Sequence, residues 1–454
     1  MNEAIRVCLI SLGCARNLVD SEVLLGHVAE EGLSIVREPE AADVVVVNTC
    51  GFIEEAKQES IDTILEACRL KDEGSVKGVV AVGCLAQRYA EDLRQSIPEL
   101  DAVMGISDYS GVPAVVRRLV NGTDKRMIAT VDGGRPKSAR SDVGRMLLTP
   151  KSYAYLRISE GCDHTCSFCA IPSMRGRNRS KPLDVLEEEA RRIAASGQKE
   201  IVLVAEDTTA YGLDLDRKRS IHTLLERVAD TPGIEWVRLM YAYPHTVLPE
   251  LTRVMREHPK VVPYLDIPVQ HISSSMLRAM RRGVSSEQVR TILTRLRDEV
   301  PGIAIRTTFI VGFPGETAED QRELRDYVAE FGFERLGVFT YSHEEGTTAY
   351  ERTDLVPHEI AEERRAEIMA LQKGIHLRRN RALVGKTMRV LVDGLDPAAS
   401  GSIVLARTTA DAPEVDAVVR IPADGLAAGD MLDVLITGAD DYDLIARPAA
   451  GVAR

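Results

Sequence analysis

Three cysteines lie close together in the sequence, just after a stretch at 153–158 whose composition is typical of a buried strand. They are Cys162, Cys166 and Cys169, and their spacing is Cys-x3-Cys-x2-Cys. Three thiolates on one short loop can bind three irons of a 4Fe–4S cluster and leave the fourth iron open to a small molecule. An open iron predicts chemistry at the cluster rather than electron storage alone.

The main alternative for this loop is a structural zinc site, which needs four ligands. Only His164 is near enough in the sequence to be the fourth, and its place inside the loop makes it an awkward ligand. Disulfides are disfavoured, because the cysteines do not form a small secreted framework and no targeting pattern opens the chain. The spacing favours a cluster and leaves zinc open.

The loop resembles the cluster loop of the radical S-adenosylmethionine enzymes, with Phe168 at the aromatic position before the third cysteine. The resemblance implies that the open iron binds the amino and carboxylate groups of S-adenosylmethionine. It also implies that an electron from the cluster cleaves the sulfonium to give a 5′-deoxyadenosyl radical, which abstracts a hydrogen from the substrate.

The first of three predicted domains spans residues 1–140. Short β-branched runs at 5–10, 44–47, 79–82 and 102–104 alternate with helical patterns at 21–31, 54–69 and 86–96. This alternation is typical of a doubly wound α/β domain with a parallel sheet. Residues 132–145 are rich in Gly, Arg, Lys and Ser, which predicts an exposed linker.

The second predicted domain spans 147–380 and repeats strand then helix. Strands are expected at 153–158, 200–204, 236–240, 264–267, 304–311 and 336–341, with a helix at 182–195 opened by proline. Six such units indicate a partial, TIM-like (β/α)6 barrel, whose active residues follow the carboxyl ends of the strands. The cysteine loop lies at such a position.

The third predicted domain, 382–450, has short strands at 388–392, 402–406, 417–421 and 431–438, separated by Gly, Asp and Pro. This pattern fits a small five-stranded, OB-like β-barrel. From residue 387 to the end there are five basic and eleven acidic residues. Such a charge favours a positively charged protein partner over a polyanion.

A second set of three cysteines, Cys14, Cys50 and Cys84, follows three predicted parallel strands of the first domain. Because parallel strands end at one edge of their sheet, these thiols are expected to converge there and to form a second cluster site. Cys8 and Cys68 fall inside a strand and a helix, and we interpret them as small buried hydrophobic residues.

A wider set of motifs resembles the methylthiotransferases, and this resemblance covers essentially the whole chain. The segments that carry it are ISLGCARNLVDSE at 10–22, NTCGFI at 48–53, VGCLAQRY at 82–89, EGCDH at 160–164, IPSMRG at 171–176 and YLDIPVQH at 264–271. The C-terminal barrel is similar to the family's TRAM domain. Ala15 and Arg16 stand where the most similar branch has proline and, more often, lysine.

That branch methylthiolates an aspartate of the small-subunit ribosomal protein at the decoding centre. The resemblance implies two 4Fe–4S clusters: Cys162, Cys166 and Cys169 would hold the one that generates the radical. The auxiliary cluster, on Cys14, Cys50 and Cys84, would carry the sulfur, methylated by a second S-adenosylmethionine, to the β-carbon of the aspartate. An electron donor such as flavodoxin or ferredoxin and a sulfur donor that the sequence does not identify would complete the system.

Other site residues are expected from the same resemblance. Glu206 lies where the family tends to anchor the methionine amino group, although a solvated carboxylate at a strand end is an equal alternative. Residues 305–312 would flank the adenine. Gln270 and His271 would either face the ligand or only close their loop.

Three other functions remain to be separated from this one. A tRNA adenosine 2-methylthiotransferase, like the related MiaB enzymes, shares both cysteine triplets, but the acidic third domain and a net charge of −12 suit tRNA poorly. A non-enzymatic iron–sulfur or zinc module would not cleave S-adenosylmethionine. A nucleophilic cysteine enzyme lacks a recognisable His and Asn frame.

Composition and hydropathy predict where the protein works. No run of residues approaches the length of a membrane span, and we expect a cytoplasmic monomer that does not contact membranes.

Overall fold

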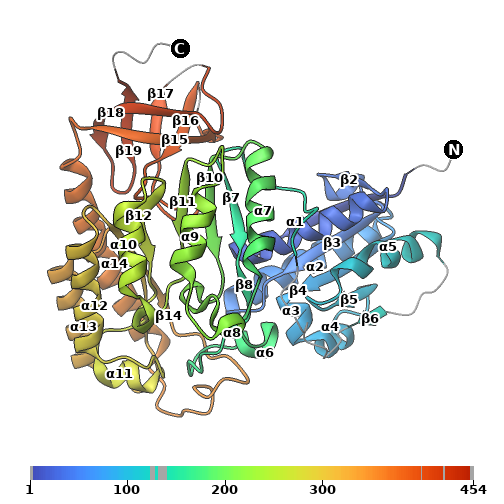
Figure 1. Ribbon diagram of the computed structural model, residues 1–454. Coiled ribbons are helices and arrows are strands. Elements are labelled where there is room, and N and C mark those ends of the chain that lie inside the picture. Colours follow the sequence, from blue (N-terminus) through green and yellow to red (C-terminus); the bar gives the residue numbers. More distant parts are fainter. Residues whose placement is uncertain (1–3, 123–127, 131–140, 400, 423–424, 450–454) are drawn as a thin grey trace.

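The computed structural model describes residues 4–122, 128–130, 141–399, 401–422 and 425–449. Three parts follow one another along the chain: an N-terminal α/β part, a central open barrel and a small C-terminal β-barrel (Figure 1). The predicted fold class is confirmed in all three parts.

The N-terminal part is a six-stranded parallel sheet in the order β2-β1-β3-β4-β5-β6. Its strands are β1 (Arg6–Ser11), β2 (Ser34–Val36), β3 (Val44–Thr49), β4 (Gly78–Gly83), β5 (Ala102–Met104) and β6 (Ile128–Thr130). The helices are α1 (Ala15–Glu30), α2 (Glu54–Asp72), α3 (Cys84–Arg88), α4 (Ala90–Ser96) and α5 (Val112–Asn121). Every residue of β3 and β4 is buried, because α1 and α5 pack on one face of the sheet and α2 to α4 on the other.

Several elements of this part differ from their predicted extents. Helix α1 begins at Ala15, six residues earlier than expected, directly after Cys14. The helix expected at 86–96 is two helices, because Tyr89 has a non-helical backbone (φ −127°, ψ 34°). The short edge strands β2 and β6 and helix α5 were not predicted, and three residues of strand give little sequence signal.

The central part is a six-stranded parallel sheet in the order β14-β13-β12-β11-β10-β7. Its strands are β7 (Tyr153–Arg157), β10 (Glu200–Val204), β11 (Trp236–Leu239), β12 (Val261–Asp266), β13 (Ala304–Val311) and β14 (Arg335–Thr340), and β8 (Ser159–Glu160) pairs with β9 (Arg179–Ser180). The helices are α6 (Ile171–Arg175), α7 (Leu183–Ala195), α8 (Leu213–Asp216), α9 (Ile221–Ala229), α10 (Pro249–Glu257), α11 (Ser274–Ala279), α12 (Ser286–Glu299), α13 (Ala318–Phe331) and α14 (His358–Arg381). The longer helices bury the outer face of the sheet, and residues of α1 and of the C-terminal barrel pack against its inner face.

In the part that the structure describes, the predicted exposed linker is exposed at Ser141, Val143 and Gly144 but not at Asp142. Residues 132–140 lie outside the described residues, but Asp142 is almost fully buried. Its carboxylate accepts hydrogen bonds from Arg157 (2.5 Å) and Lys181 (2.7 Å), and these two cations lower the pKa of Asp142 although burial alone would raise it. A count of polar residues cannot show that their partners are brought in from distant strands.

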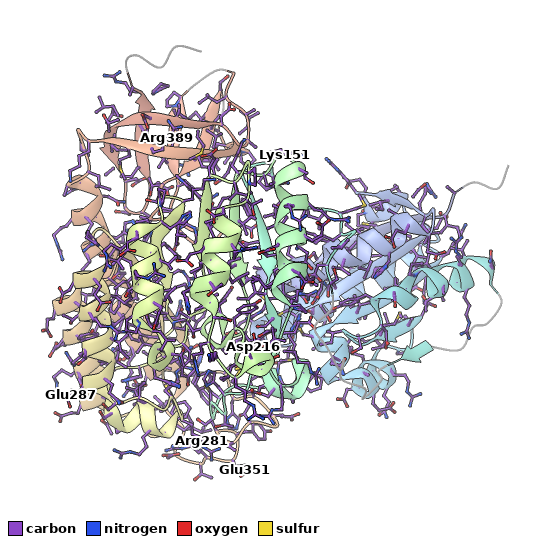
Figure 2. The ribbon with its side chains drawn as sticks, viewed as in Figure 1. Lys151, Asp216, Arg281, Glu287, Glu351 and Arg389 are labelled. Carbon is purple, nitrogen blue, oxygen red and sulfur yellow. The ribbon has the colours of Figure 1, made fainter. Side chains whose placement is uncertain are left out.

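The C-terminal part is a closed five-stranded barrel in the order β15-β16-β17-β19-β18. Its strands are β15 (Thr387–Leu395), β16 (Ile403–Arg407), β17 (Val419–Pro422), β18 (Met431–Ala439) and β19 (Leu444–Pro448). It packs against residues at the amino ends of the central strands, so it lies at the opposite end from the cysteine loops (Figure 1). Figure 2 shows Arg389 of β15 at one end of the molecule and Arg281 at the other.

Buried ion pairs attach this barrel to the central sheet. The guanidinium of Arg407 donates to Glu200 at 2.7 Å and to Asp393 at 2.7 and 2.9 Å, and Arg238 donates to the other oxygen of Glu200 at 2.7 Å. Burial alone would raise the pKa of Glu200, but Arg238 and Arg407 lower it below its usual value. Three acidic residues of the C-terminal part contact the central sheet directly: Asp411 pairs with Arg335, Asp416 pairs with Arg306, and Glu414 accepts a hydrogen bond from Tyr155.

Replacing Arg407 by alanine is expected to destabilise the protein strongly. The change leaves the fully buried Glu200 with one cation instead of two and Asp393 without its partner, which typically costs about 3–5 kcal/mol. Urea unfolding and limited proteolysis of the C-terminal barrel would measure the effect. The exposed pair of Arg389 with Asp433 offers a control, since Arg389→Ala is expected to change stability by less than about 1 kcal/mol.

The contact between α14 and the C-terminal barrel is expected to weaken in mild acid. The Nε2 of His376 lies 3.0 Å from the carbonyl oxygen of Tyr442, and burial, then Arg335, lowers the histidine pKa from 6.5 to about 4. The folded state therefore holds His376 neutral, so its contribution is complete above pH 6.5 and is lost as the pH falls toward 4. Thermal unfolding between pH 7 and 4 should show a loss of about 2–3 kcal/mol that His376→Gln removes. An equal pH dependence in the variant would contradict this assignment.

No helix among the described residues is both long enough and apolar enough to cross a lipid bilayer.

Candidate functional site

The structure places Cys14, Cys50 and Cys84 at one edge of the N-terminal sheet. Cys14 precedes α1 after strand β1, Cys50 follows β3 directly, and Cys84 is the first residue of α3 after β4. All three strands are parallel and adjacent, so their carboxyl ends meet at this edge. The predicted convergence follows from this topology.

Glycines allow the three loops to approach one another closely. A Cβ on Gly13 would lie 2.9 Å from the Cβ and 3.1 Å from the Sγ of Cys50, and a Cβ on Gly51 would lie 2.8 Å from the Cα of Leu85. Real Cβ atoms do not come so close, and Gly13 also has a positive φ of 90°. A larger residue at either position would separate the cysteine loops.

Asn17 ties the loops together. Its side-chain amide donates to the carbonyl oxygens of Leu12 (2.6 Å) and Thr49 (3.2 Å), and its Oδ1 lies 4.0 Å from the Sγ of Cys84. This buried residue therefore contacts all three cysteine-bearing segments from the first turn of α1. Sequence analysis did not single out Asn17, whose only signal is its place three residues after Cys14.

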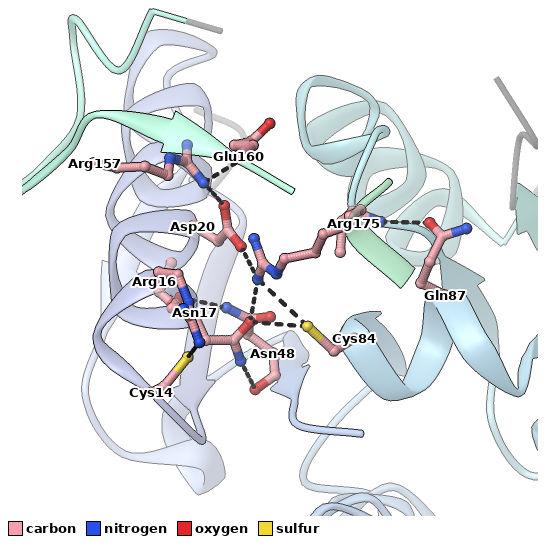
Figure 3. Close-up of polar contacts among 12 residues, drawn as sticks. Cys14, Arg16, Asn17, Asp20, Asn48, Cys84, Gln87, Arg157, Glu160 and Arg175 are labelled. Carbon is pink, nitrogen blue, oxygen red and sulfur yellow. Dashed lines mark hydrogen bonds and ion pairs between the residues drawn. The ribbon is translucent and has the colours of Figure 1, made fainter. Parts of the chain in front are cut away.

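Arg175 connects the N-terminal cysteines to the central barrel. It ends α6, and its Nη2 donates to Asp20 of α1 at 2.7 Å and to the Sγ of Cys84 at 3.4 Å (Figure 3). Arg157 of β7 also pairs with Asp20. The two domains thus share a buried ionic interface beside the cysteines, which sequence analysis did not identify.

The thiols of this set differ in their ease of ionisation. Burial opposes ionisation of Cys14, but the guanidiniums of Arg16 and Arg175 outweigh it and lower the pKa of Cys14. Burial raises the pKa of Cys50 to about 11, and it also raises the pKa of Cys84. Thiols with raised pKa values are poor free nucleophiles at neutral pH, whereas ligation by a metal displaces their protons.

The loop that carries Cys162, Cys166 and Cys169 follows β7 and β8 at the carboxyl end of the central sheet. Backbone hydrogen bonds fix it: the N–H of Cys162 donates to Gly176 (3.0 Å), and that of Cys169 donates to Cys166 (3.2 Å). Burial raises the pKa of Cys162 to about 12 and that of Cys169 to about 11.

Arg282 provides positive charge at this loop. Its Nη1 donates to the Sγ of Cys166 at 3.2 Å, its Nη2 donates to the carbonyl of Pro268, and its guanidinium lies over the ring of Tyr243, 4.1 Å from the ring centre. The Tyr243 hydroxyl lies 3.7 Å from the same sulfur. Neither Arg282 nor Tyr243 was identified from the sequence.

The zinc alternative finds no support in the geometry. His164 stacks on Tyr243 with ring centres 3.6 Å apart, and its Nε2 lies 2.7 Å from Asp207. Across the residues the structure describes, no three His, Cys, Asp or Glu side chains converge on one metal-ion position. Thiolates of a 4Fe–4S cube bind separate irons and need no such common point. His164, the candidate for a fourth zinc ligand in this loop, is instead held by Asp207 and Tyr243.

Glu206 is buried, so the alternative of a solvated carboxylate is wrong. Its Oε1 lies 3.6 Å from the Nε of Arg16 and 3.8 Å from the Nε of Arg175, and neither of its oxygens has a hydrogen-bond partner. The side chain is 3% exposed. An ionised carboxylate in this state can accept hydrogen bonds from an ammonium group.

Two residues of the segment after the fourth barrel strand, β12, have different roles. His271 is fully buried, with Nδ1 accepting from the N–H of Ser273 (3.0 Å) and Nε2 3.3 Å from Glu316, so it closes its loop. Gln270 has a positive φ of 77°, and its Oε1 is buried without a partner. Its backbone pairs with β13 beside Phe309, which places Gln270 next to residues 305–312.

Comparison with known families gives a match in each of the three parts of the chain. Residues 6–105 match the uncharacterized protein family UPF0004, residues 156–328 match the Radical SAM superfamily, and residues 384–448 match the TRAM domain.

Several curated relatives resemble the chain over nearly its full length. The ribosomal protein uS12 methylthiotransferase RimO of Trichlorobacter lovleyi is 42% identical and covers 97% of both chains. The enzyme of the same name from Myxococcus xanthus is 45% identical over 97% of this chain and 90% of its own, and that from Aquifex aeolicus is 44% identical over 97% of each.

Among solved structures, the radical S-adenosylmethionine methyltransferase TsrM from Kitasatospora setae, with tryptophan and a S-adenosylmethionine analogue bound, shares the fold. Its TM-score is 0.54 at 16% identity, and the match covers 88% of this chain and 80% of that one.

Proposed function

This chain belongs to the RimO family of radical S-adenosylmethionine methylthiotransferases, and we propose that it transfers a methylthio group to the β-carbon of an aspartate in ribosomal protein uS12. The observation that carries the proposal is the pair of cysteine triplets at the carboxyl ends of two parallel sheets, on two domains joined by the Arg175 interface. Family membership at this coverage favours uS12 over a tRNA adenosine as the acceptor.

Each cysteine triplet is proposed to hold a 4Fe–4S cluster. Cys162, Cys166 and Cys169 would hold one, and Cys14, Cys50 and Cys84 the other. When bound, the clusters and two molecules of S-adenosylmethionine would supply two groups: the 5′-deoxyadenosyl radical, which removes the β-hydrogen, and a methylated sulfur, which takes the place of that hydrogen. The chain therefore needs an external reductant, such as flavodoxin or ferredoxin, and a sulfur donor.

The residues around the triplets are proposed to stabilise the cysteine sulfurs and to bind and orient S-adenosylmethionine. Arg282 donates toward Cys166, and Arg175 donates toward Cys84, so each triplet has a fixed positive charge that stabilises anionic sulfur. Glu206 is proposed to hold the ammonium group of S-adenosylmethionine, since both of its oxygens are free of hydrogen bonds. Burial of these groups excludes water from the radical.

The position of the C-terminal barrel limits its part in the reaction. Two of its acidic residues, Asp411 and Asp416, pair with arginines of the central barrel, and it lies at the far end from the cysteines. It does not line the reaction site, so a basic protein bound to its remaining acidic surface would have to extend along the molecule to reach the cysteines.

The acceptor can be tested with the anaerobically reconstituted full-length protein. Incubation with S-adenosylmethionine, sulfide and a reductant is expected to add one methylthio group in place of one hydrogen on uS12, measured by mass spectrometry of its peptides. Bulk tRNA under the same conditions is expected to gain nothing. Product on tRNA alone would refute the proposed function in favour of a MiaB-like one.

A further inference from the structure

Arg16 reaches from the N-terminal domain to the carboxyl end of the central sheet. It lies in the first turn of α1, and its Nη1 donates to the carbonyl oxygen of Ala205 at 2.9 Å, just past strand β10. Its guanidinium lies over the ring of Tyr241, 4.9 Å from the ring centre, just past strand β11. Its Nη2 is 3.7 Å from the Sγ of Cys14 (Figure 3). One side chain thus touches both domains at their cysteine-bearing edges.

Arg16 lies between the edges that carry the two cysteine triplets. It contacts Cys14 of the N-terminal triplet on one side. On the other side it contacts Ala205 and Tyr241, which follow β10 and β11 at the carboxyl end of the central sheet, the end at which the loop of the second triplet lies. A substrate that reacts with chemistry from both must pass through this region.

Arg16 has hydrogen-bonding capacity that the folded chain leaves unused. Its Nε is buried without a partner and lies 3.6 Å from Glu206, too far for a hydrogen bond. The side chain is 14% exposed. The Nη1 of Arg175 and the Nε of Arg282 are also buried without partners, but Arg175 and Arg282 as whole residues are only 6% and 5% exposed. The Nη2 of Arg175 donates to Asp20 and Cys84. Arg282 donates to Cys166 and Pro268. Of these three arginines, Arg16 is the most accessible to an incoming anion.

The proposed substrate carries such an anion next to the reacting atom. The β-carbon of an aspartate is bonded directly to its carboxylate, so functionalising that carbon brings a negative charge into a buried site. An unpaired carboxylate is costly to bury, whereas a guanidinium can bind it with two parallel hydrogen bonds. We propose that Arg16 binds the side-chain carboxylate of the substrate and thereby holds its β-carbon between the two cysteine triplets. This inference rests on the proposed function.

Glu206 fits this assignment as the resting partner of Arg16. The two groups neutralise each other at 3.6 Å without hydrogen bonds. If the ammonium group of S-adenosylmethionine binds Glu206 and the substrate carboxylate binds Arg16, each of these two side chains gains a hydrogen-bonded partner of opposite charge. The site would then select a substrate with a carboxylate over one with the isosteric neutral amide.

The test compares two fluorescent uS12 peptides that differ only in having aspartate or asparagine at the target position. Binding to the anaerobically reconstituted protein is measured by anisotropy, without turnover. The wild type is expected to bind the aspartate peptide about 10- to 100-fold more tightly. Arg16→Gln should abolish this preference, and Arg16→Lys should restore most of it. Arg256→Gln, on the outer helix α10, is the matched control that should keep it.

Each result has a defined meaning. Equal affinity of the wild type for both peptides would overturn the proposal, and this result needs no variant. Arg16→Gln with an unchanged aspartate preference would also overturn it, provided that iron and sulfide contents equal those of the wild type. If Arg16→Gln does not assemble, Arg16→Met fills the same volume without the charge and takes its place. Failure of the wild type to methylthiolate uS12 would refute the proposed function separately.

Discussion

Replacing Cys166 by alanine is expected to abolish the formation of 5′-deoxyadenosine. Cys166 receives a hydrogen bond from Arg282 at 3.2 Å and lies 3.7 Å from the Tyr243 hydroxyl, at the centre of the loop proposed to hold the radical-generating cluster. Loss of one of three ligands should release that cluster and lower iron per chain from about eight to about four. Anaerobic reconstitution, iron and sulfide analysis, and chromatography of the S-adenosylmethionine products would measure both effects.

The matched control for this experiment is Cys8→Ala. Cys8 is a buried thiol in strand β1 that donates to the carbonyl of Arg37 at 3.3 Å, and burial raises its pKa to about 11. Its removal should cost some stability and leave iron content and 5′-deoxyadenosine formation unchanged. A Cys166→Ala protein that still formed 5′-deoxyadenosine at the wild-type rate would exclude this loop as the radical source.

Replacing Cys84 by alanine is expected to abolish methylthiolation while leaving 5′-deoxyadenosine formation in place. Cys84 lies on the N-terminal domain, beside Asn17 and Arg175, whereas the ligands proposed for the radical-generating cluster all lie on the central barrel. The change should again halve the iron content from about eight to about four. Mass spectrometry of uS12 and product chromatography on the same sample would separate the two activities.

Cys68→Ala provides the control for this second experiment. Cys68 lies in α2 of the same domain, burial raises its pKa to about 11, and it packs in the hydrophobic core away from the sheet edge. This variant should retain both clusters and the product. If Cys84→Ala lost 5′-deoxyadenosine as well as product, the two triplets would not act separately, and the division of roles between the domains would be wrong.

The strands of the central barrel were predictable because β7, β10 and β11 are fully buried and mostly apolar, and β13 is dominated by apolar and β-branched residues. The expected ranges 200–204 and 304–311 coincide with β10 and β13, and the other four agree within a few residues. Strands buried on both faces need apolar side chains at nearly every position, which gives a strong local signal. The short strands β2 and β6 and the break in the helical run at Tyr89 depend on neighbours distant in the sequence.

The six cysteines were visible in the sequence for two different reasons. Cys162, Cys166 and Cys169 are held within one loop by their spacing. Cys14, Cys50 and Cys84 follow parallel strands, and the topology of such a sheet brings strand ends together. The sequence by itself therefore determined the fold class, the two sets of thiols and, through its motifs, the family.

Only the tertiary structure decided which charges surround these thiols. Arg16, Arg175, Arg282 and Glu206 come from separate segments. The contacts of Arg175 with Cys84 and of Arg16 with Glu206 depend on how two domains pack, and that of Arg282 with Cys166 depends on how the central barrel folds. Folding also buries Asp142, where an exposed linker was expected, and pairs acidic residues of the C-terminal part with the central barrel. An ion pair forms only when the two charges lie within a few ångströms of each other in space. For residues that folding alone brings together, the spacing in the sequence does not reveal that distance.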